Sequence, residues 1–273
     1  MGSTIAGYPC TPLALGAMPM DMSGTAEYGL YTSEATQRHA YGRRMITWDG
    51  RVFKYALTTA AITTSNIDQL VHQGYSQHID YGATIAKTTI AGATEFVVDI
   101  SATMGKADDG VIAKNEMAGG SIIVYSDTIA TIQRGIIGNS AVATGEMTVY
   151  VDAPIPVVLT VDASYAEGIC SPYYGVAPGE GGGSLSMLGM PQVYCDANTN
   201  IWIQTWGVCW VSPQSDVGDA AHDLQVVARS DGSLQSHAYG TAMATLQQHV
   251  GFVLSHAADG TQGAPFIMLQ ISI

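Results

Sequence analysis

The sequence predicts an all-β fold, built from β-sandwich or barrel modules with an extended N-terminal arm and little helix. Three observations support this prediction. Short runs of β-branched and aromatic residues are separated by Gly, Asn and Asp, a hairpin signal covers residues 43–56, and residues 201–211 alternate with a period of two. Each of these patterns is typical of strands joined by tight turns.

The hairpin signal consists of two strand-like runs, residues 43–48 and 51–56, joined by Asp49-Gly50. Glycine accepts the positive φ that a tight primed turn needs, so an Asp-Gly pair between such runs favours a β-hairpin. We expect this hairpin to be the clearest local element of the first half.

Further strands are expected wherever a short apolar run ends at a turn residue. The ranges are 95–100, 120–125, 130–137, 146–151, 223–229, 249–255 and 265–272. Helix is considered for two short stretches alone, residues 65–73 and 238–248. The rest of the second half is dominated by the alternating stretch at residues 201–211.

In that stretch Trp202, Trp206 and Trp210 recur at every fourth position, which in a regular strand places them on one face. The residues between them are also largely apolar, so we predict a strand that is buried on both sides. Tryptophans in this arrangement favour a core role. The alternative is a sugar-stacking platform formed by the same three rings.

The chain divides by composition into an arm at residues 1–35, a β-rich module at 36–170 and a second β-rich module at 171–273. The second boundary is placed at residues 171–191, where three prolines and a run of glycines predict a long loop. Whether the two modules form one compact unit is left open.

Charged residues make up 12% of the chain, against about 25% in ordinary soluble domains. We interpret this as a surface that neighbouring subunits cover; an extracellular β-protein with a Ser/Thr/Asn surface is the alternative. The net charge of −13 argues against nucleic acid and membrane as partners, and no apolar run approaches the ~18 residues of a membrane span. Five of the ten basic residues nevertheless lie within residues 38–54, which fits either a segment that docks on an acidic surface or a strand face with ordinary cations.

Motifs for catalysis are missing from the sequence. Residues 183–186 resemble a nucleophile elbow but lack its last glycine, and the glycine run at 179–183 lacks the Gly-Lys-Ser/Thr ending of a phosphate loop. We therefore expect neither an enzyme nor a cofactor.

Metal ligation and disulfides are also weakly indicated. Asp216, Asp219 and Asp223 are weak candidates for Ca²⁺, and a solvated acidic loop explains them better than a metal site. The four cysteines form no Cys-x-x-Cys pair. Cys195 and Cys209 could pair, but buried thiols are favoured.

Several stretches resemble the head decoration or capsid-stabilising proteins of tailed phages. They are residues 43–56, 119–124, 132–139, 148–155, 171–176, 202–207 and 250–254. The resemblance implies a β-rich subunit of the virion that binds the outer surface of an assembled capsid, with the major capsid protein and copies of itself as partners. A homotrimer or a capsid-templated cluster is the arrangement expected from it.

An arm and a basic hairpin on an otherwise acidic chain suggest where such a subunit would touch the capsid. The candidate contact residues are Tyr8, Leu30, Arg38, Arg43 and Arg44. Two other functions are kept as alternatives: a receptor- or glycan-binding module on a particle surface, and a subunit of a self-assembling tube or filament.

Overall fold

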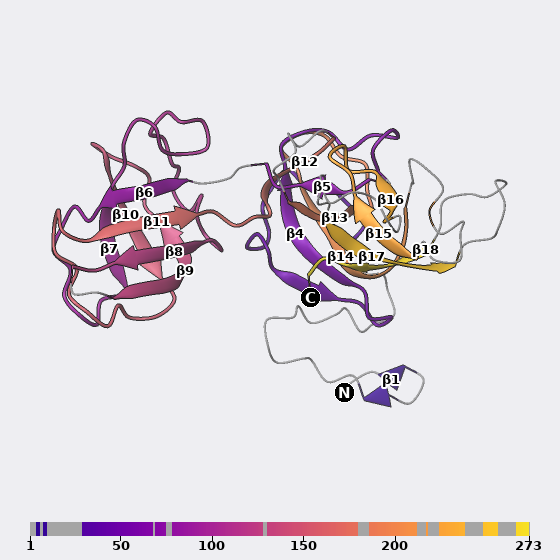
Figure 1. Ribbon diagram of the computed structural model, residues 1–273, viewed down its shortest axis with the longest axis horizontal. Helices are drawn as coiled ribbons and strands as arrows, with labels where there is room; N and C mark the ends of the chain where they lie inside the picture. Colours follow the sequence, from indigo (N-terminus) through magenta and orange to yellow (C-terminus); the bar gives the residue numbers. More distant parts are fainter. Residues whose placement is uncertain are drawn as a thin grey trace. The chain divides into compact units, whose positions relative to one another are not determined.

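The computed structural model describes residues 4–5, 8–9, 29–67, 69–74, 78–127, 130–179, 186–211, 217, 224–237, 248–255 and 266–272. Within these residues the fold is all-β, as predicted, and contains no helix. No helix capable of crossing a membrane was found among them. The chain forms two compact units: unit 1 comprises residues 1–74 and 175–273, and unit 2 comprises residues 75–174 (Figure 1).

Unit 1 contains a ten-stranded sheet in the order β16-β15-β17-β18-β14-β13-β5-β12-β4-β3, and β14 pairs in addition with β4. That extra pairing closes β14, β13, β5, β12 and β4 into a five-stranded barrel. The strands are β3 (Arg44–Ile46), β4 (Val52–Thr58), β5 (Val71–His72), β12 (Tyr174–Pro178), β13 (Met187–Pro191), β14 (Asn200–Trp210), β15 (Gln225–Ala228), β16 (Leu234–Ser236), β17 (His249–Ser255) and β18 (Phe266–Gln270). A separate two-stranded pair, β1 (Thr4–Ile5) and β2 (Tyr8–Pro9), precedes them.

The predicted hairpin is confirmed as β3 and β4, which pair Met45 with Phe53 and Ile46 with Val52. Its turn differs from the expected primed type. The Gly50 amide donates to the Thr47 carbonyl at 3.0 Å, and Gly50 alone in the turn has a positive φ, of 86°. A type I turn followed by a glycine bulge has this pattern, and it makes a three-residue hairpin loop.

Strand β14 was predicted correctly in position but not in the direction of its side chains. Its register with β4 shifts by one residue between Gln204 and Trp206, which places Thr205 in a β-bulge. Gln204 pairs with Phe53 and Trp206 pairs with Val52, and these two residues of β4 point to opposite faces. Trp206 and Trp210 therefore lie on the face opposite Trp202, and the prediction of a single tryptophan face is wrong.

Unit 2 is a curled six-stranded sheet in the order β6-β11-β8-β9-β10-β7. Its strands are β6 (Ile79–Thr84), β7 (Glu95–Asp99), β8 (Ser121–Tyr125), β9 (Thr131–Asn139), β10 (Glu146–Val151) and β11 (Tyr165–Ile169). The two edge strands approach each other at an isolated bridge between Ile85 and Val98. Inward-facing residues such as Phe96, Val124 and Met147 fill the interior.

The strands predicted within residues 95–151 and near the C-terminus are all present. Two other expectations are corrected. Residues 64–67 form a turn instead of a helix, and 238–247, the core of the second helix candidate, lie outside the described residues. The expected loop at 171–191 contains β12 and β13, and Pro178 and Pro191 each occupy the last residue of a strand, so the missing N–H affects one end of each ladder alone.

The division into units also differs from the expected modules. Residues 36–74 join the second half of the chain because β4 pairs with β14, and unit 2 is inserted between them. The boundary expected near residue 170 lies close to the end of unit 2.

Candidate functional site

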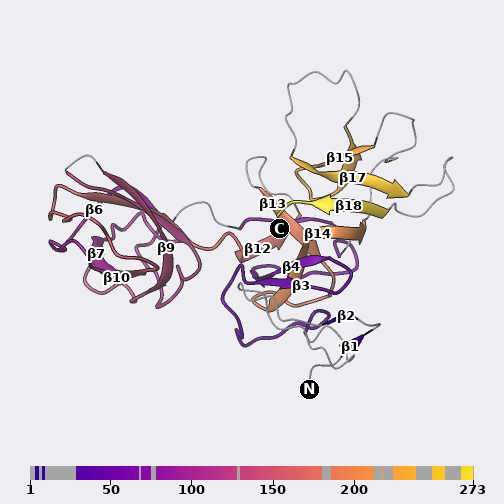
Figure 2. The same ribbon diagram turned by 90° about the horizontal axis from the view of Figure 1, so that it is seen from below.

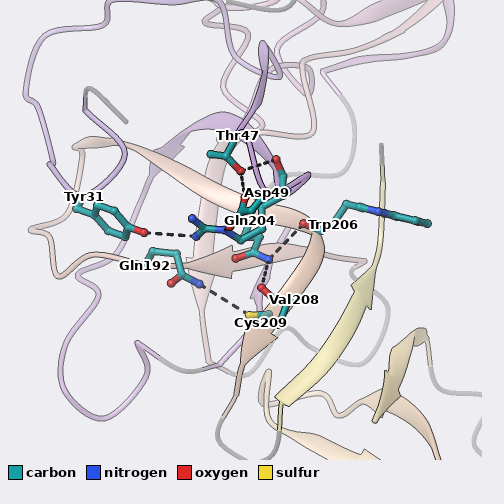
Figure 3. A network of polar contacts seen from close by, with 9 residues as sticks. Tyr31, Thr47, Asp49, Gln192, Gln204, Trp206, Val208 and Cys209 are labelled. Carbon is teal, nitrogen blue, oxygen red and sulfur yellow. Dashed lines mark hydrogen bonds and ion pairs between the residues drawn. The ribbon is translucent and has the colours of Figure 1, made fainter. Parts of the chain in front are cut away.

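The tip of the β3–β4 hairpin is held by a network of polar contacts (Figure 3). The Thr47 hydroxyl donates to Asp49 Oδ1 at 2.5 Å, and Arg51 Nε donates to Asp49 Oδ2 at 2.7 Å. Arg51 Nη1 also donates to the hydroxyl of Tyr31 at 3.4 Å, and its guanidinium lies 5.4 Å from the centre of the Phe53 ring. These contacts fix the loop between the two strands.

Asp49 is the central acceptor of this network. Burial raises the pKa of its carboxyl, but the hydrogen bonds from Thr47 and Arg51 and the guanidinium charge outweigh burial, so its pKa lies below the ordinary value. The carboxylate therefore stays ionised over the neutral and mildly acidic range, and the loop keeps its shape there.

The fixed loop presents Trp48 to solvent. This side chain is 84% exposed, the highest value among the large apolar side chains that the structure describes. Isolated exposed apolar residues are common on protein surfaces, but a tryptophan is costly to expose and is enriched at binding hot spots. Trp48 was not singled out in the sequence, although its place just before Asp49-Gly50 at a hairpin tip was visible.

The hairpin packs against β14 through a close backbone approach at Gly207. A Cβ atom at this position would lie 2.9 Å from the Cα of Arg51, and Gly207 has a φ of +100°. The close approach and the positive φ each require glycine at this position. Arg51, whose guanidinium belongs to the polar network, thus lies directly against β14.

Two cations face each other across the hairpin. Arg44 pairs with Lys54 in the β3–β4 register, and both side chains are half-buried. Burial, and then the charge of Arg44, lowers the pKa of Lys54. Like charges directly opposite destabilise an antiparallel pair, so this arrangement favours an external anionic partner. Arg43, next to them, is exposed.

Arg38 lies in a separate setting, close to the barrel strands. It forms an ion pair with Glu34, and its backbone amide donates to the Tyr55 hydroxyl at 3.2 Å. Burial, followed by the charge of Arg43, lowers the pKa of the neighbouring His39, with Arg38 adding to the effect. Arg38 and Arg43 thus both lie near this imidazole, so the structure brings these two candidates together.

Leu30 cannot serve as a contact residue, which corrects the sequence-based expectation. Its side chain is fully buried and packs with Met45, Phe53, Tyr55 and Trp202. The end of the expected arm therefore belongs to unit 1, and Glu34 forms a bridge with Asn200. Tyr8 lies in the short strand β2, and its side chain is outside the described part of the structure.

The three-tryptophan platform is not formed. Trp202 is 3% exposed and lies in an aromatic cluster, 5.1 Å from Tyr55 and 5.5 Å from His39 between ring centres. Trp210 is nearly half exposed on the other face of β14, and Trp206 is partly buried. Beside Trp202 is a hollow of about 20 Å³, room for about one water molecule and not for a sugar.

The remaining residues considered from the sequence are the three aspartates and the cysteines. Asp216, Asp219 and Asp223 lie outside the described residues, and among the described ones no three His, Cys, Asp or Glu side chains gather as a metal site. Cys170, Cys195 and Cys209 are buried thiols, as favoured from the sequence.

Unit 2 holds a cluster around the buried Glu116 that was not expected from the sequence. Glu116 is 6% exposed, accepts a hydrogen bond from the Ala113 amide at 2.7 Å, and lies 3.7 Å from His78 Nε2 and 3.9 Å from Lys106 Nζ. Burial, then the Glu116 charge, raises the pKa of the nearby Cys170 to about 12. A thiol with so high a pKa is a poor nucleophile at neutral pH, so we interpret the cluster as structural.

A second hollow, of about 320 Å³, opens beside β6 in unit 2. It is lined by small and polar residues such as Gly82, Thr84 and Asp99, with Met104 among the apolar ones. The Thr84 hydroxyl already donates to Asp99 Oδ2 at 2.7 Å. With its one carboxylate already engaged and no aromatic ring in its lining, this hollow favours no particular ligand.

Comparisons with known proteins add no relative: no family model, no curated protein and no solved structure matches this chain. The resemblance to phage decoration proteins therefore stays a prediction.

Proposed function

We propose that this chain is a non-enzymatic structural protein of a phage virion, which binds the outer surface of an assembled capsid and stabilises it. The observation that carries the proposal is the hairpin, which exposes Trp48 at its tip and carries Arg43, Arg44 and Lys54 along its strands, on a chain of net charge −13. A hairpin with an exposed apolar ring at its tip and cations along its strands fits an acidic protein surface with an apolar socket. The capsid as the owner of that surface comes from the sequence resemblance.

Stabilisation would follow from binding linkage. A ligand that binds the assembled shell and not its free subunits shifts the equilibrium toward the shell, and many copies add many modest increments. The major capsid protein is the proposed partner. The glycan-binding alternative is weakened because Trp202 is buried and cannot share a platform with Trp210.

The first test is the copy number of this chain, measured by quantitative peptide mass spectrometry in phage particles purified from its source. A copy number comparable with that of the main shell protein is the expected result. A few copies per particle would instead indicate a tail or receptor-binding part, and absence from the particles would contradict the proposal.

The second test addresses the hairpin itself. Particles freed of this chain are incubated with the recombinant full-length protein, and the bound fraction is measured by sedimentation. We expect Trp48→Ala to lower the affinity at least tenfold, in line with a hot-spot tryptophan, while Tyr194→Ala, an exposed aromatic elsewhere in unit 1, leaves it unchanged. Equal binding by both variants would remove the hairpin from the proposal.

A further inference from the structure

An exposed apolar face covers the part of unit 1 beyond the β14 bulge. Here β14, β18 and β17 lie side by side with β18 in the middle (Figure 2). The register aligns Val208 with Met268 and Met268 with Phe252, in one row across the three strands, and Trp210 with Phe266 in the next row. We call this set the apolar face; it consists of Val208, Trp210, Phe252, Leu254, Phe266 and Met268.

The face is open although its strands are firmly packed. Val208, Trp210, Phe252, Leu254 and Phe266 are each between 39% and 50% exposed. The residues between them, such as Cys209, Val253 and Ile267, are buried in the core on the other side of the sheet. The exposed apolar area is on the order of 500 Å², toward the upper end for the largest patch of a monomer. A patch of this size and regularity favours a binding surface.

Charge limits what can cover this face. The three strands contain no Asp, Glu, Lys or Arg, whereas the chain as a whole carries −13. A partner with ordinary surface charge would bury its ions against apolar side chains, which is costly. Two copies of this acidic chain repel each other elsewhere, but here they can meet without burying a carboxylate. The occupant that fits is another uncharged, apolar sheet face.

Geometry sets how such a copy would bind. Two sheets pack face to face in layers about 10 Å apart, and each face accommodates one opposing layer. When both partners use the same face the contact is isologous, and its symmetry is two-fold. A two-fold axis that runs parallel to β18 between the two copies would place Val208 of one copy opposite Phe252 of the other.

We propose that the apolar face binds a second copy of this chain in a two-fold dimer. This goes beyond the capsid function and holds whether or not the hairpin binds a shell. It also differs from the three-fold clustering that the sequence resemblance implies, so the two expectations can be separated by stoichiometry.

The test is sedimentation velocity of the purified full-length chain between about 1 and about 100 μM. The wild type is expected to dimerise in this range. Phe252→Glu and Val208→Lys should each weaken the dimer at least tenfold, because each buries a charge in the contact. Tyr194→Glu, which adds a charge at an exposed site outside the face, should leave it unchanged, as should Trp48→Ala.

A wild type that stays monomeric at the highest concentration overturns the proposal, and this result needs no variant to fold. A trimer overturns the two-fold arrangement. A dimer that both apolar-face variants leave intact, with circular dichroism showing them folded, overturns the assignment of the surface. If Trp48→Ala loses capsid binding but still dimerises, the dimer proposal is unaffected. The dimer and the capsid-binding hairpin are therefore tested separately.

Discussion

The two halves of β14 have similar sequences but differ in how they are buried. Before the bulge at Thr205 the strand is buried on both sides, and Trp202 packs inside an aromatic cluster. Beyond the bulge one side enters the core while the other, with Val208 and Trp210, meets solvent. One inserted residue inverts the faces of the strand, so a continuous alternation in sequence can contain a fully buried half followed by a half with one exposed face.

The largest expected effect contrasts the two tryptophans. Trp202→Ala should lower the free energy of unfolding of unit 1 by about 3–5 kcal/mol, because it empties a buried site, while Trp210→Ala should lower it by about 1–2 kcal/mol in the monomer, because nearly half of this side chain is exposed. All four tryptophans of the chain lie in unit 1, so tryptophan fluorescence during urea unfolding reports on that unit. Equal losses for the two variants would refute the inversion of faces.

The next effect concerns the junction between the hairpin and β14. Gly207→Ala should destabilise unit 1 by about 2–3 kcal/mol, since it adds a close contact with the Arg51 backbone to the cost of a positive φ. Gly50→Ala is the matched control: Gly50 also has a positive φ but nothing lies within 4 Å of its Cβ position, so about 1 kcal/mol is expected. Urea unfolding compares them, and a Gly50 variant at least as damaging as the Gly207 variant would contradict the close approach.

The sequence predicted those elements whose signals are local. The Asp-Gly turn predicted the hairpin. Apolar runs bounded by turn residues predicted β7 to β10, β17 and β18. The local signal of the bulge at Thr205 is Gly207, because an isolated glycine inside a strand indicates a bulge or a close backbone approach. The resulting change of faces, however, depends on how β14 pairs with β4, a strand distant in the sequence. Leu30 was misassigned for the same reason, because its burial depends on strands far along the chain.

The candidate site was partly predictable. The basic residues of the hairpin stood out in the sequence, and Arg43 and Arg44 remain contact candidates. The exposure of Trp48 could not be read from residue type, because a strand-flanking tryptophan is more often buried. The cluster around Glu116 unites segments that a sequence cannot bring together without the fold.

A smaller effect tests the Asp49 network by pH. The folded pKa of Asp49 is depressed, so its contribution is complete above the ordinary aspartate pKa of about 3.9 and is lost as the pH falls through the folded value. Asp49→Asn should therefore cost about 0.5–1 kcal/mol at pH 6, a modest value because the carboxylate is about a third exposed, and the difference should vanish in strong acid. Hydrogen exchange of the Thr47 and Gly50 amides measures the stability of the loop itself. If wild type and variant differ by the same amount at every pH, the ionised carboxylate is excluded as the cause.

The smallest effect has the opposite sign. Arg44→Gln removes one of two cations that face each other across the hairpin, so it should raise the free energy of unfolding by about 0.2–1 kcal/mol at neutral pH. Because the pKa of Lys54 is depressed in the folded chain, this gain should disappear as the pH rises through the ordinary lysine range and the repulsion ends. Arg43→Gln, at an exposed site without a cation opposite it in the register, should leave stability unchanged, and thermal unfolding of the two variants provides the comparison. A variant that is more stable yet binds capsids more weakly would mean that the strained pair is kept for its partner, whereas a loss of stability in Arg44→Gln would mean that the guanidinium serves the fold.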